Sequence, residues 1–256
     1  MEAIQNFLKT QYKEVSIAAL CIVGAVLVIK RLKKREKKNY PPNTIIHHQV
    51  GRGPYAPSQS PFAVKLETYL RMAKVPFMNE HDSETNRSSK DKNFSGEEIA
   101  AGRAIQRMVD EHLYWTLALQ RWVFDPKNGI DSGRKRLGVP WLVFLLVRNN
   151  IKKQTYAQGV GRHTEKEVMQ VMEEDLQTLS KLLGKKKYIL GEHASQTDCS
   201  VFAILSQIHW QDFGGAAKKV YKKYPNLSAY TERMKEEFWP DWDDCITRGG
   251  TRKAPK

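Results

Sequence analysis

Cysteine is scarce in this sequence. The 256 residues contain three cysteines, Cys21, Cys199 and Cys245. Their separations fit neither a CxxC redox motif nor the ligand spacing of a zinc site. A disulfide framework is therefore not expected, and a reducing compartment is the simpler interpretation.

Metal-ligand spacing is absent as well. His47 and His48 are adjacent on a predicted strand, so their side chains point to opposite faces and do not share an ion. The remaining histidines form no HxxxH pair; they are His81, His112, His163, His193 and His209. We predict no metal site.

A basic surface typical of nucleic-acid binding is also missing, although the net charge is +14. Residues 30–38 carry seven Lys/Arg and one Glu, and residues 248–256 carry four Lys/Arg, so the two segments hold ten of the fourteen charges. A cationic cluster directly after an apolar segment is explained by membrane topology. We predict no nucleic-acid partner.

The apolar segment is residues 15–29, which contain no charged side chain. Fifteen residues rise about 22 Å as a helix, against a hydrocarbon core of about 30 Å, so flanking residues have to extend the span. A signal peptide would carry its cations before the apolar run, whereas here they follow it. We predict a single-pass membrane anchor at 15–32, after an N-terminal segment at 1–14.

The positive-inside bias places everything after the anchor in the cytosol. The short span favours a thin membrane, of the endoplasmic reticulum or the mitochondrial outer membrane. A basic linker at 33–43 would join the anchor to the folded part.

A strand-helix-strand unit is predicted at 44–78. Residues 44–50 are apolar and β-branched, as in a buried strand. Ser60 is a favoured N-cap residue and Pro61 suits the first helical position, so a helix should begin there. A second strand follows at Val75–Met78. This is the start of a thioredoxin-like domain, and a polar linker follows at 79–96.

The rest of the chain is predicted to be helical, from 97 to 242, with a basic tail at 243–256. Thr164 and Glu167 have the spacing of a capping box, and Ser195 and Asp198 repeat it. The predicted fold class is α+β and mostly helical: an incomplete βαβ start, then an all-helical domain of the glutathione-transferase C-terminal type.

Five segments carry a closer resemblance: "PSQSPFAVKLETYLRMAKVPF", "MVDEHLYWTLALQRWVF", "QGVGRHTEKEV", "KKYILGEHASQTDCSVFAIL" and "FWPDW". Together they resemble the failed axon connections family, which is glutathione-transferase-like and related to metaxins. The resemblance covers roughly residues 44–242. It implies a thioredoxin-like domain, a helical domain and a role in axon development.

The sequence departs from the family after the second strand. The family pattern K-x-P-W-x-x-x-N and the following D-S are absent, and the polar linker stands in their place. About half of the expected thioredoxin-like domain is therefore missing. The resemblance implies that these absent groups hold glutathione, so we expect no cofactor and weak glutathione binding at best.

Ser58 and Ser60 are the candidate catalytic residues, because some glutathione transferases hold the glutathione thiolate with a serine near this helix start. The simpler interpretation is that Ser60 is a structural cap, as are Pro61, Thr164, Glu167, Ser195 and Asp198. Glu111, His112, Tyr114 and Trp115 form a polar and aromatic cluster that either packs in the core or lines an interdomain cleft.

The favoured function is a membrane-anchored, cytosol-facing, glutathione-transferase-like protein that acts by protein interaction. Its protein partners are not identified by the sequence, and a homodimer is compatible with it. Two alternatives stay open. One is an active glutathione transferase that uses Ser58 or Ser60, and the other is a metaxin-like component of mitochondrial outer-membrane import.

Overall fold

The computed structural model describes residues 40–49, 51–80, 94–124, 141–211, 215–248 and residue 254. The predicted anchor at 15–32 and most of the predicted linker at 79–96 lie outside these ranges. Within them, no helix combines the length and the apolarity that a membrane span requires. The described residues from Asn43 onward belong to one compact unit.

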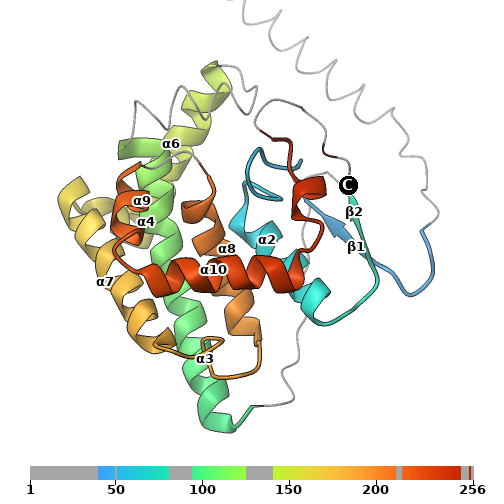
Figure 1. Cartoon of the computed structure of the whole chain (residues 1–256). Helices are drawn as coiled ribbons and strands as arrows, with labels where there is room; N and C mark the ends of the chain where they lie inside the picture. Colours follow the sequence, from blue (N-terminus) through green and yellow to red (C-terminus); the bar gives the residue numbers. More distant parts are fainter. Residues whose placement is uncertain are drawn as a thin grey trace, which may run out of the picture. The chain divides into compact units, whose positions relative to one another are not determined.

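The predicted strand-helix-strand unit is present. Strand β1 (Ile45–His48), helix α2 (Pro61–Met72) and strand β2 (Phe77–Glu80) follow one another (Figure 1). The strands pair in parallel, with Ile45 opposite Phe77 and His48 opposite Glu80. A parallel pair needs a crossover connection, and α2 provides it. In the described residues the sheet has these two strands alone.

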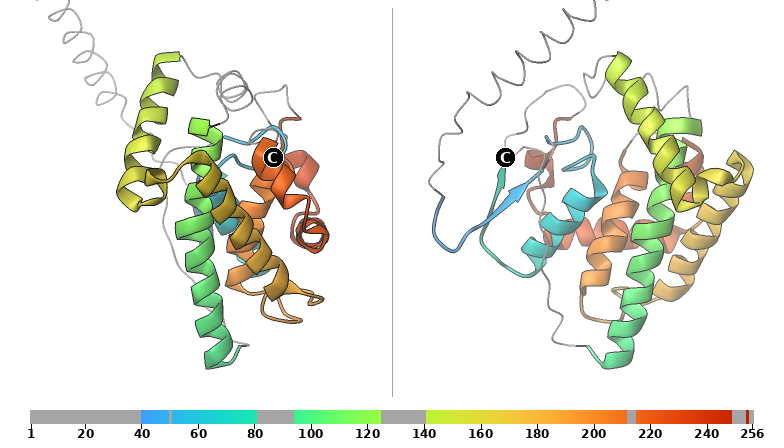
Figure 2. Two further views of the ribbon diagram at one scale, coloured as in Figure 1. Left: turned by 90° about the vertical axis from the view of Figure 1, so that its left-hand side faces the viewer. Right: turned by 180° about the vertical axis from the view of Figure 1, so that it is seen from behind.

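The predicted helix at 97–124 is a continuous helical rod with two changes of pitch. Helix α3 (Gly96–Met108) leads through the π-turn η1 (Val109–Leu113) into α4 (Tyr114–Leu119) and the π-turn η2 (Gln120–Phe124). Figure 2 shows the four segments as one green rod. No proline or further glycine interrupts residues 103–124, so the chain stays helical throughout.

The other described helical segments follow in chain order and confirm that the fold is mostly helical. They are α6 (Trp141–Gln158), η4 (Val160–Arg162), α7 (Glu165–Leu183), α8 (Gln196–His209), α9 (Gly215–Tyr221), α10 (Pro225–Phe238) and η5 (Trp242–Cys245).

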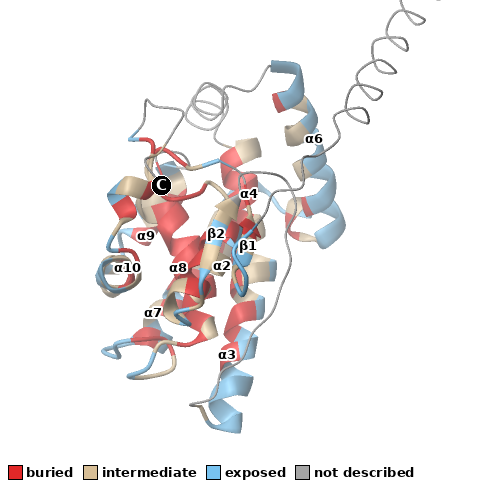
Figure 3. Ribbon diagram, turned by 90° about the vertical axis from the view of Figure 1, so that its right-hand side faces the viewer, coloured by how far each residue is buried: buried red, intermediate tan, exposed pale blue. Residues whose placement is uncertain are grey.

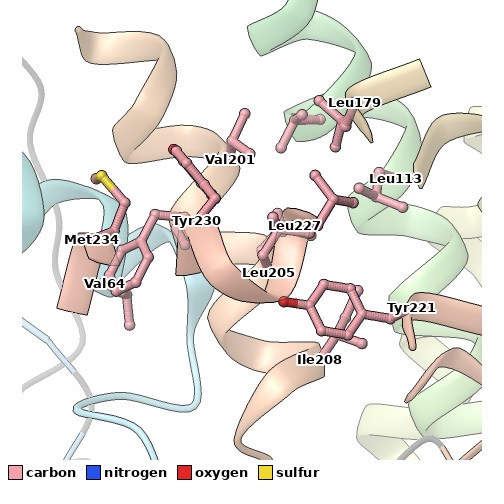
Figure 4. Packing of buried hydrophobic residues seen from close by; sticks show 14 of the residues in the cluster. Val64, Leu113, Leu179, Val201, Leu205, Ile208, Tyr221, Leu227, Tyr230 and Met234 are labelled. Carbon is pink, nitrogen blue, oxygen red and sulfur yellow. The ribbon is translucent and has the colours of Figure 1, made fainter. Parts of the chain in front are cut away.

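Helix α8 is the centre of the core. Every residue of α8 except Gln196 and His209 is buried, as its red colour in Figure 3 shows. It packs against α2, α3, η1, α9 and α10. Figure 4 shows Val64 of α2, Leu205 of α8 and Tyr230 of α10 in one apolar cluster. The strand-helix-strand unit and the helical part therefore share a single core.

Residues past the predicted end of the helical domain at 242 are also packed. Cys245 is fully buried, and the amide of Thr247 donates to the carbonyl of Gly53 at 2.9 Å. The C-terminal segment Trp239–Thr247 thus returns to the loop in front of α2.

The two predicted capping boxes begin α7 and α8. The Thr164 amide donates to the Glu167 carboxylate at 2.8 Å, and the Glu167 amide donates to the Thr164 hydroxyl at 3.4 Å. This pair is exposed. At α8, the Asp198 carboxylate accepts from the Ser195 amide at 2.8 Å and from the Ser195 hydroxyl at 2.7 Å.

Asp198 does more than cap its own helix. Its side chain is completely buried and also accepts from the Ile189 amide at 2.9 Å and the Tyr230 hydroxyl at 3.0 Å. Burial raises the pKa of Asp198 above its ordinary value, although these hydrogen bonds act in the opposite direction. One carboxylate therefore joins the loop before α8 to α10.

Replacing Asp198 by alanine should destabilise the fold much more than replacing Thr164 by alanine. Asp198→Ala leaves four buried donors without their acceptor, and we expect a loss of about 3 kcal/mol. Thr164→Ala removes an exposed cap worth about 1 kcal/mol. Denaturant unfolding followed by tryptophan fluorescence measures both, and equal losses would contradict the role given to Asp198.

Candidate functional site

The start of α2 is the place where the resemblance puts a catalytic group. Ser58 is 1% exposed. Its hydroxyl accepts a hydrogen bond from the Ser60 amide at 3.2 Å, and its carbonyl accepts from the Gln207 side chain at 2.9 Å. Helix α8, which carries Gln207, thus contacts Ser58 and leaves it almost fully buried.

Ser60 lies at the N-cap position of α2, as predicted, but its hydroxyl makes no capping hydrogen bond. Its backbone is extended and its carbonyl accepts from the Val64 amide at 3.2 Å, yet its side chain makes no capping hydrogen bond. Pro61 follows at the first helical position and has no amide hydrogen, so this turn has one donor fewer to satisfy. Ser60 is half-buried and is the more accessible of the two serines.

Aromatic rings stand next to this helix start. The rings of Phe62 and Tyr114 are 4.8 Å apart, and those of Tyr114 and Trp115 are 4.9 Å apart. Phe62 is 39% exposed, while burial raises the pKa of Tyr114. An ion pair between Lys65 and Asp110 joins α2 to η1 beside them.

The four residues predicted as one polar and aromatic cluster around Tyr114 have different partners in the structure. His112 Nδ1 lies 2.8 Å from the carboxylate of Asp175 on α7, and Glu111 forms an exposed ion pair with Arg107. Tyr114 contacts Phe62 of α2, whereas Trp115 packs against the cluster of Leu119, Val160 and Val168. Among the described residues there is no cluster of metal-ligating side chains.

A buried ionic network that the sequence did not reveal surrounds Glu67 of α2. This residue is completely buried. Arg52 donates to both of its carboxylate oxygens, at 2.7 and 3.2 Å. Arg71 donates to Oε1 at 3.0 Å and Gln49 to Oε2 at 3.0 Å. Burial raises the pKa of Glu67, but the hydrogen bonds and charges of the arginines outweigh it, so the pKa lies below its ordinary value.

Arg71 extends the network to the C-terminal segment. It donates to both oxygens of Asp241, at 2.6 and 3.3 Å, in a bidentate pair. Its guanidinium lies 4.1 Å from the centre of the Trp239 ring, a cation–π contact. The Trp239 indole in turn donates to the Thr68 hydroxyl of α2 at 3.0 Å.

The network is suited to holding segments together and not to acid-base chemistry. Two arginines face two carboxylates, and the oxygens of Glu67 are occupied by donors. Nearby, burial raises the pKa of the Cys245 thiol to about 11, so this thiol is protonated at neutral pH. The i,i+4 spacing of Glu67 and Arg71 is the one feature of the sequence that indicates this network.

Comparison with known proteins shows similarity over part of the chain. Residues 172–234 match the family described as "Glutathione S-transferase, C-terminal domain", and these residues run from within α7 to within α10. Two solved structures show weak overall likeness. The beta-etherase LigF from Sphingobium sp. strain SYK-6 is 16% identical with a TM-score of 0.49, covering 73% of this chain and 94% of its own. A glutathione S-transferase from Methylobacterium radiotolerans is 12% identical with a TM-score of 0.47, covering 81% and 96%.

Individual relatives confirm the resemblance of the sequence to the failed axon connections family. Failed axon connections of Drosophila melanogaster is 27% identical over 262 aligned positions, covering 83% of this chain and 62% of the relative. Metaxin-2 of Mus musculus is 28% identical over 146, covering 55% and 56%. Isoprene-epoxide–glutathione S-transferase of Rhodococcus sp. (strain AD45) is 27% identical over 159, covering 58% and 65%.

The chain is a glutathione-transferase-like protein related to failed axon connections and metaxin. It spans about three fifths of the length of these curated relatives.

Neutralising Glu67 should weaken the fold in a pH-dependent way. Glu67→Gln leaves two buried arginines without their shared carboxylate, and we expect a loss of about 3 kcal/mol at pH 7. Because the pKa of Glu67 is lowered in the folded protein, its contribution is present above the unfolded value of about 4.3 and is lost as pH falls through the folded value. The difference between wild type and variant should therefore shrink in acid.

Glu111→Gln provides the matched control, since Glu111 is in an exposed i,i+4 pair with Arg107 and should cost less than about 0.5 kcal/mol. Denaturant unfolding at several pH values gives both numbers. A Glu67→Gln variant as stable as Glu111→Gln would show that the network does not hold the fold.

Proposed function

We propose that this chain is a membrane-anchored, glutathione-transferase-like protein that acts by binding other proteins and not by catalysis. The observation that carries the proposal is the burial of one of the two candidate serines at the start of α2. Ser58 is buried beneath α8 with its carbonyl bonded to Gln207. Of the two candidate serines, Ser60 alone keeps access to a ligand.

The described residues around Ser60 provide no base for its hydroxyl. A serine nucleophile needs a base within hydrogen-bond reach, and no carboxylate, imidazole or amine of the described residues bonds to the Ser60 side chain, so its hydroxyl keeps only the role of a hydrogen-bond donor to a thiolate. Thiol chemistry finds no better support, because Cys199 is fully buried and burial raises the pKa of Cys245. We therefore propose that no cofactor is required and that glutathione binds weakly if it binds.

The anchor is proposed from the sequence alone. Residues 15–29 are uncharged and the cations of residues 30–38 follow directly, which favours a single-pass segment at 15–32 with the folded domain in the cytosol. The membrane would be that of the endoplasmic reticulum or the mitochondrial outer membrane. The relationship to failed axon connections supports a role in axon development through protein partners, which include a second copy of the chain as a candidate.

An active glutathione transferase is the second candidate function. Two observations favour it: Ser60 is only half-buried at the start of α2, and one relative is a glutathione S-transferase by name. In that case the Ser60 hydroxyl would hydrogen-bond the glutathione thiolate, with Phe62 and Tyr114 beside the electrophile.

A metaxin-like component of mitochondrial outer-membrane import is the third candidate. The match to Metaxin-2 over 146 aligned positions favours it. Localisation of the tagged full chain to the endoplasmic reticulum alone would count against this function.

The full chain tests the proposal directly. We expect it to stay in the membrane pellet during alkaline carbonate extraction, because residues 15–32 would span the bilayer. After detergent solubilisation it should pass through glutathione agarose without retention and should not accelerate conjugation of 1-chloro-2,4-dinitrobenzene above the uncatalysed rate.

Ser60→Ala is the control, and it should behave as wild type in both glutathione assays. Turnover by the wild type that falls at least tenfold in Ser60→Ala would establish the transferase instead. Release of the chain into the carbonate supernatant would contradict the anchor.

A further inference from the structure

Helix α6 carries an exposed apolar surface. Trp141 is 57% exposed, Leu142 66%, Val143 43% and Leu146 62%. With Tyr156 at 61%, α6 holds five of the eleven large apolar side chains that are exposed in the described residues. Figure 3 shows the helix largely in the colour of exposed residues. Such a concentration on one helix is typical of an interaction surface.

The opposite face of α6 fixes the helix to the body of the protein. Phe144 is buried and its ring stacks on that of Trp122 of η2, with centroids 5.3 Å apart. Near the other end, Gln158 donates to the carbonyl of Glu111 at 2.7 Å. Thr155 is buried as well. The helix is thus attached along one side, and its outer surface is a fixed feature of the fold.

Leu142 and Leu146 lie on the outer face with Lys153. They are four and seven residues apart, so they line up along the helix, roughly opposite Phe144 and Thr155. From Leu142 to Tyr156 this face is about 21 Å long. Its first half is apolar and its second half is cationic and aromatic.

The charge of α6 indicates what covers this surface. Residues 141–158 contain Arg148, Lys152 and Lys153 and no acidic residue, and both lysines are exposed. Helices that lie in an anionic membrane interface combine an apolar side with cationic side chains and often carry a tryptophan near one end. Helix α6 has this composition. Tryptophan is enriched at that interface.

A second copy of the chain fits the surface less well. A two-fold interface through α6 would enclose two copies each of Arg148, Lys152 and Lys153. Those like charges would repel one another, with no acidic side chain on α6 to offset them. Acidic phospholipid headgroups offer the complementary charge.

We propose that α6 docks on the surface of a membrane that contains acidic phospholipids. Trp141, Leu142 and Leu146 enter the boundary between headgroups and acyl chains, and Lys152 and Lys153 bind the headgroup phosphates. This inference builds on the proposed anchor, which would keep α6 close to a bilayer at high effective concentration.

Quenching by brominated acyl chains tests the docking in the full chain. All six tryptophans lie after residue 114, so the predicted anchor contributes no signal. The chain is reconstituted in vesicles of phosphatidylcholine with 30% phosphatidylserine, whose acyl chains carry bromine near the headgroup. We expect part of the tryptophan fluorescence to be quenched, and Trp141→Phe to lose that part. Trp242→Phe, at a buried ring, should keep it.

Two double variants test separately the contribution of the lysine charges and the insertion of the leucine side chains. Lys152→Glu combined with Lys153→Glu should reduce the quenching at least threefold, and so should phosphatidylcholine without phosphatidylserine. Leu142→Glu combined with Leu146→Glu should abolish it. These four side chains are exposed, and thermal melting checks that the variants remain folded.

The outcomes separate this inference from the anchor. If the chain binds vesicles but the fluorescence of Trp141 is not quenched, the docking of α6 is overturned and the anchor is still supported. Release by carbonate together with quenched Trp141 removes the anchor and supports the docking. A lipid-independent dimer that the Leu142 and Leu146 variants convert to a monomer overturns the docking in favour of a second copy.

Discussion

The buried carboxylate of Glu67 is the constraint on which the arrangement of the chain depends. A charge in the interior is costly unless it is paired and fully hydrogen-bonded. Glu67 meets that condition with Arg52 from the loop before α2, Arg71 from its own helix and Gln49 from the end of β1. Three consecutive pieces of the N-terminal part, the end of β1, the loop and α2, are therefore held in one geometry by a single side chain.

Arg71 transmits that constraint to the far end of the sequence. Through Asp241 and the ring of Trp239 it ties α2 to residues about 170 positions later. A parallel pair of strands with one helix has little apolar area of its own to bury. In this protein the missing support comes from outside the sheet: α8 packs along α2, and the C-terminal segment closes over the ion pairs.

Local patterns in the sequence predicted most of the elements. The capping spacing at Thr164 and Ser195 marks the starts of α7 and α8, because capping is decided within four residues. The apolar, β-branched run around β1 and the proline at position 61 predicted their elements for the same reason. The burial of Ser58 and the ion pair of Arg71 depend on partners far along the chain, Gln207 and Asp241, which no local pattern reveals. The N-cap position of Ser60 is a local feature as well, whereas the absence of a hydrogen bond from its hydroxyl is visible only in the structure.

These contacts join the strand-helix-strand unit to the helical part and to the C-terminal segment. Our account predicts a strong energetic coupling across the ion pair between α2 and the C-terminal segment. A double-mutant cycle with Arg71→Met and Asp241→Asn, measured by denaturant unfolding of the full chain, tests this most directly. The predicted coupling free energy is about 1 to 2 kcal/mol. A coupling of zero, with additive single losses, would contradict the claim that this network holds the two ends of the fold together.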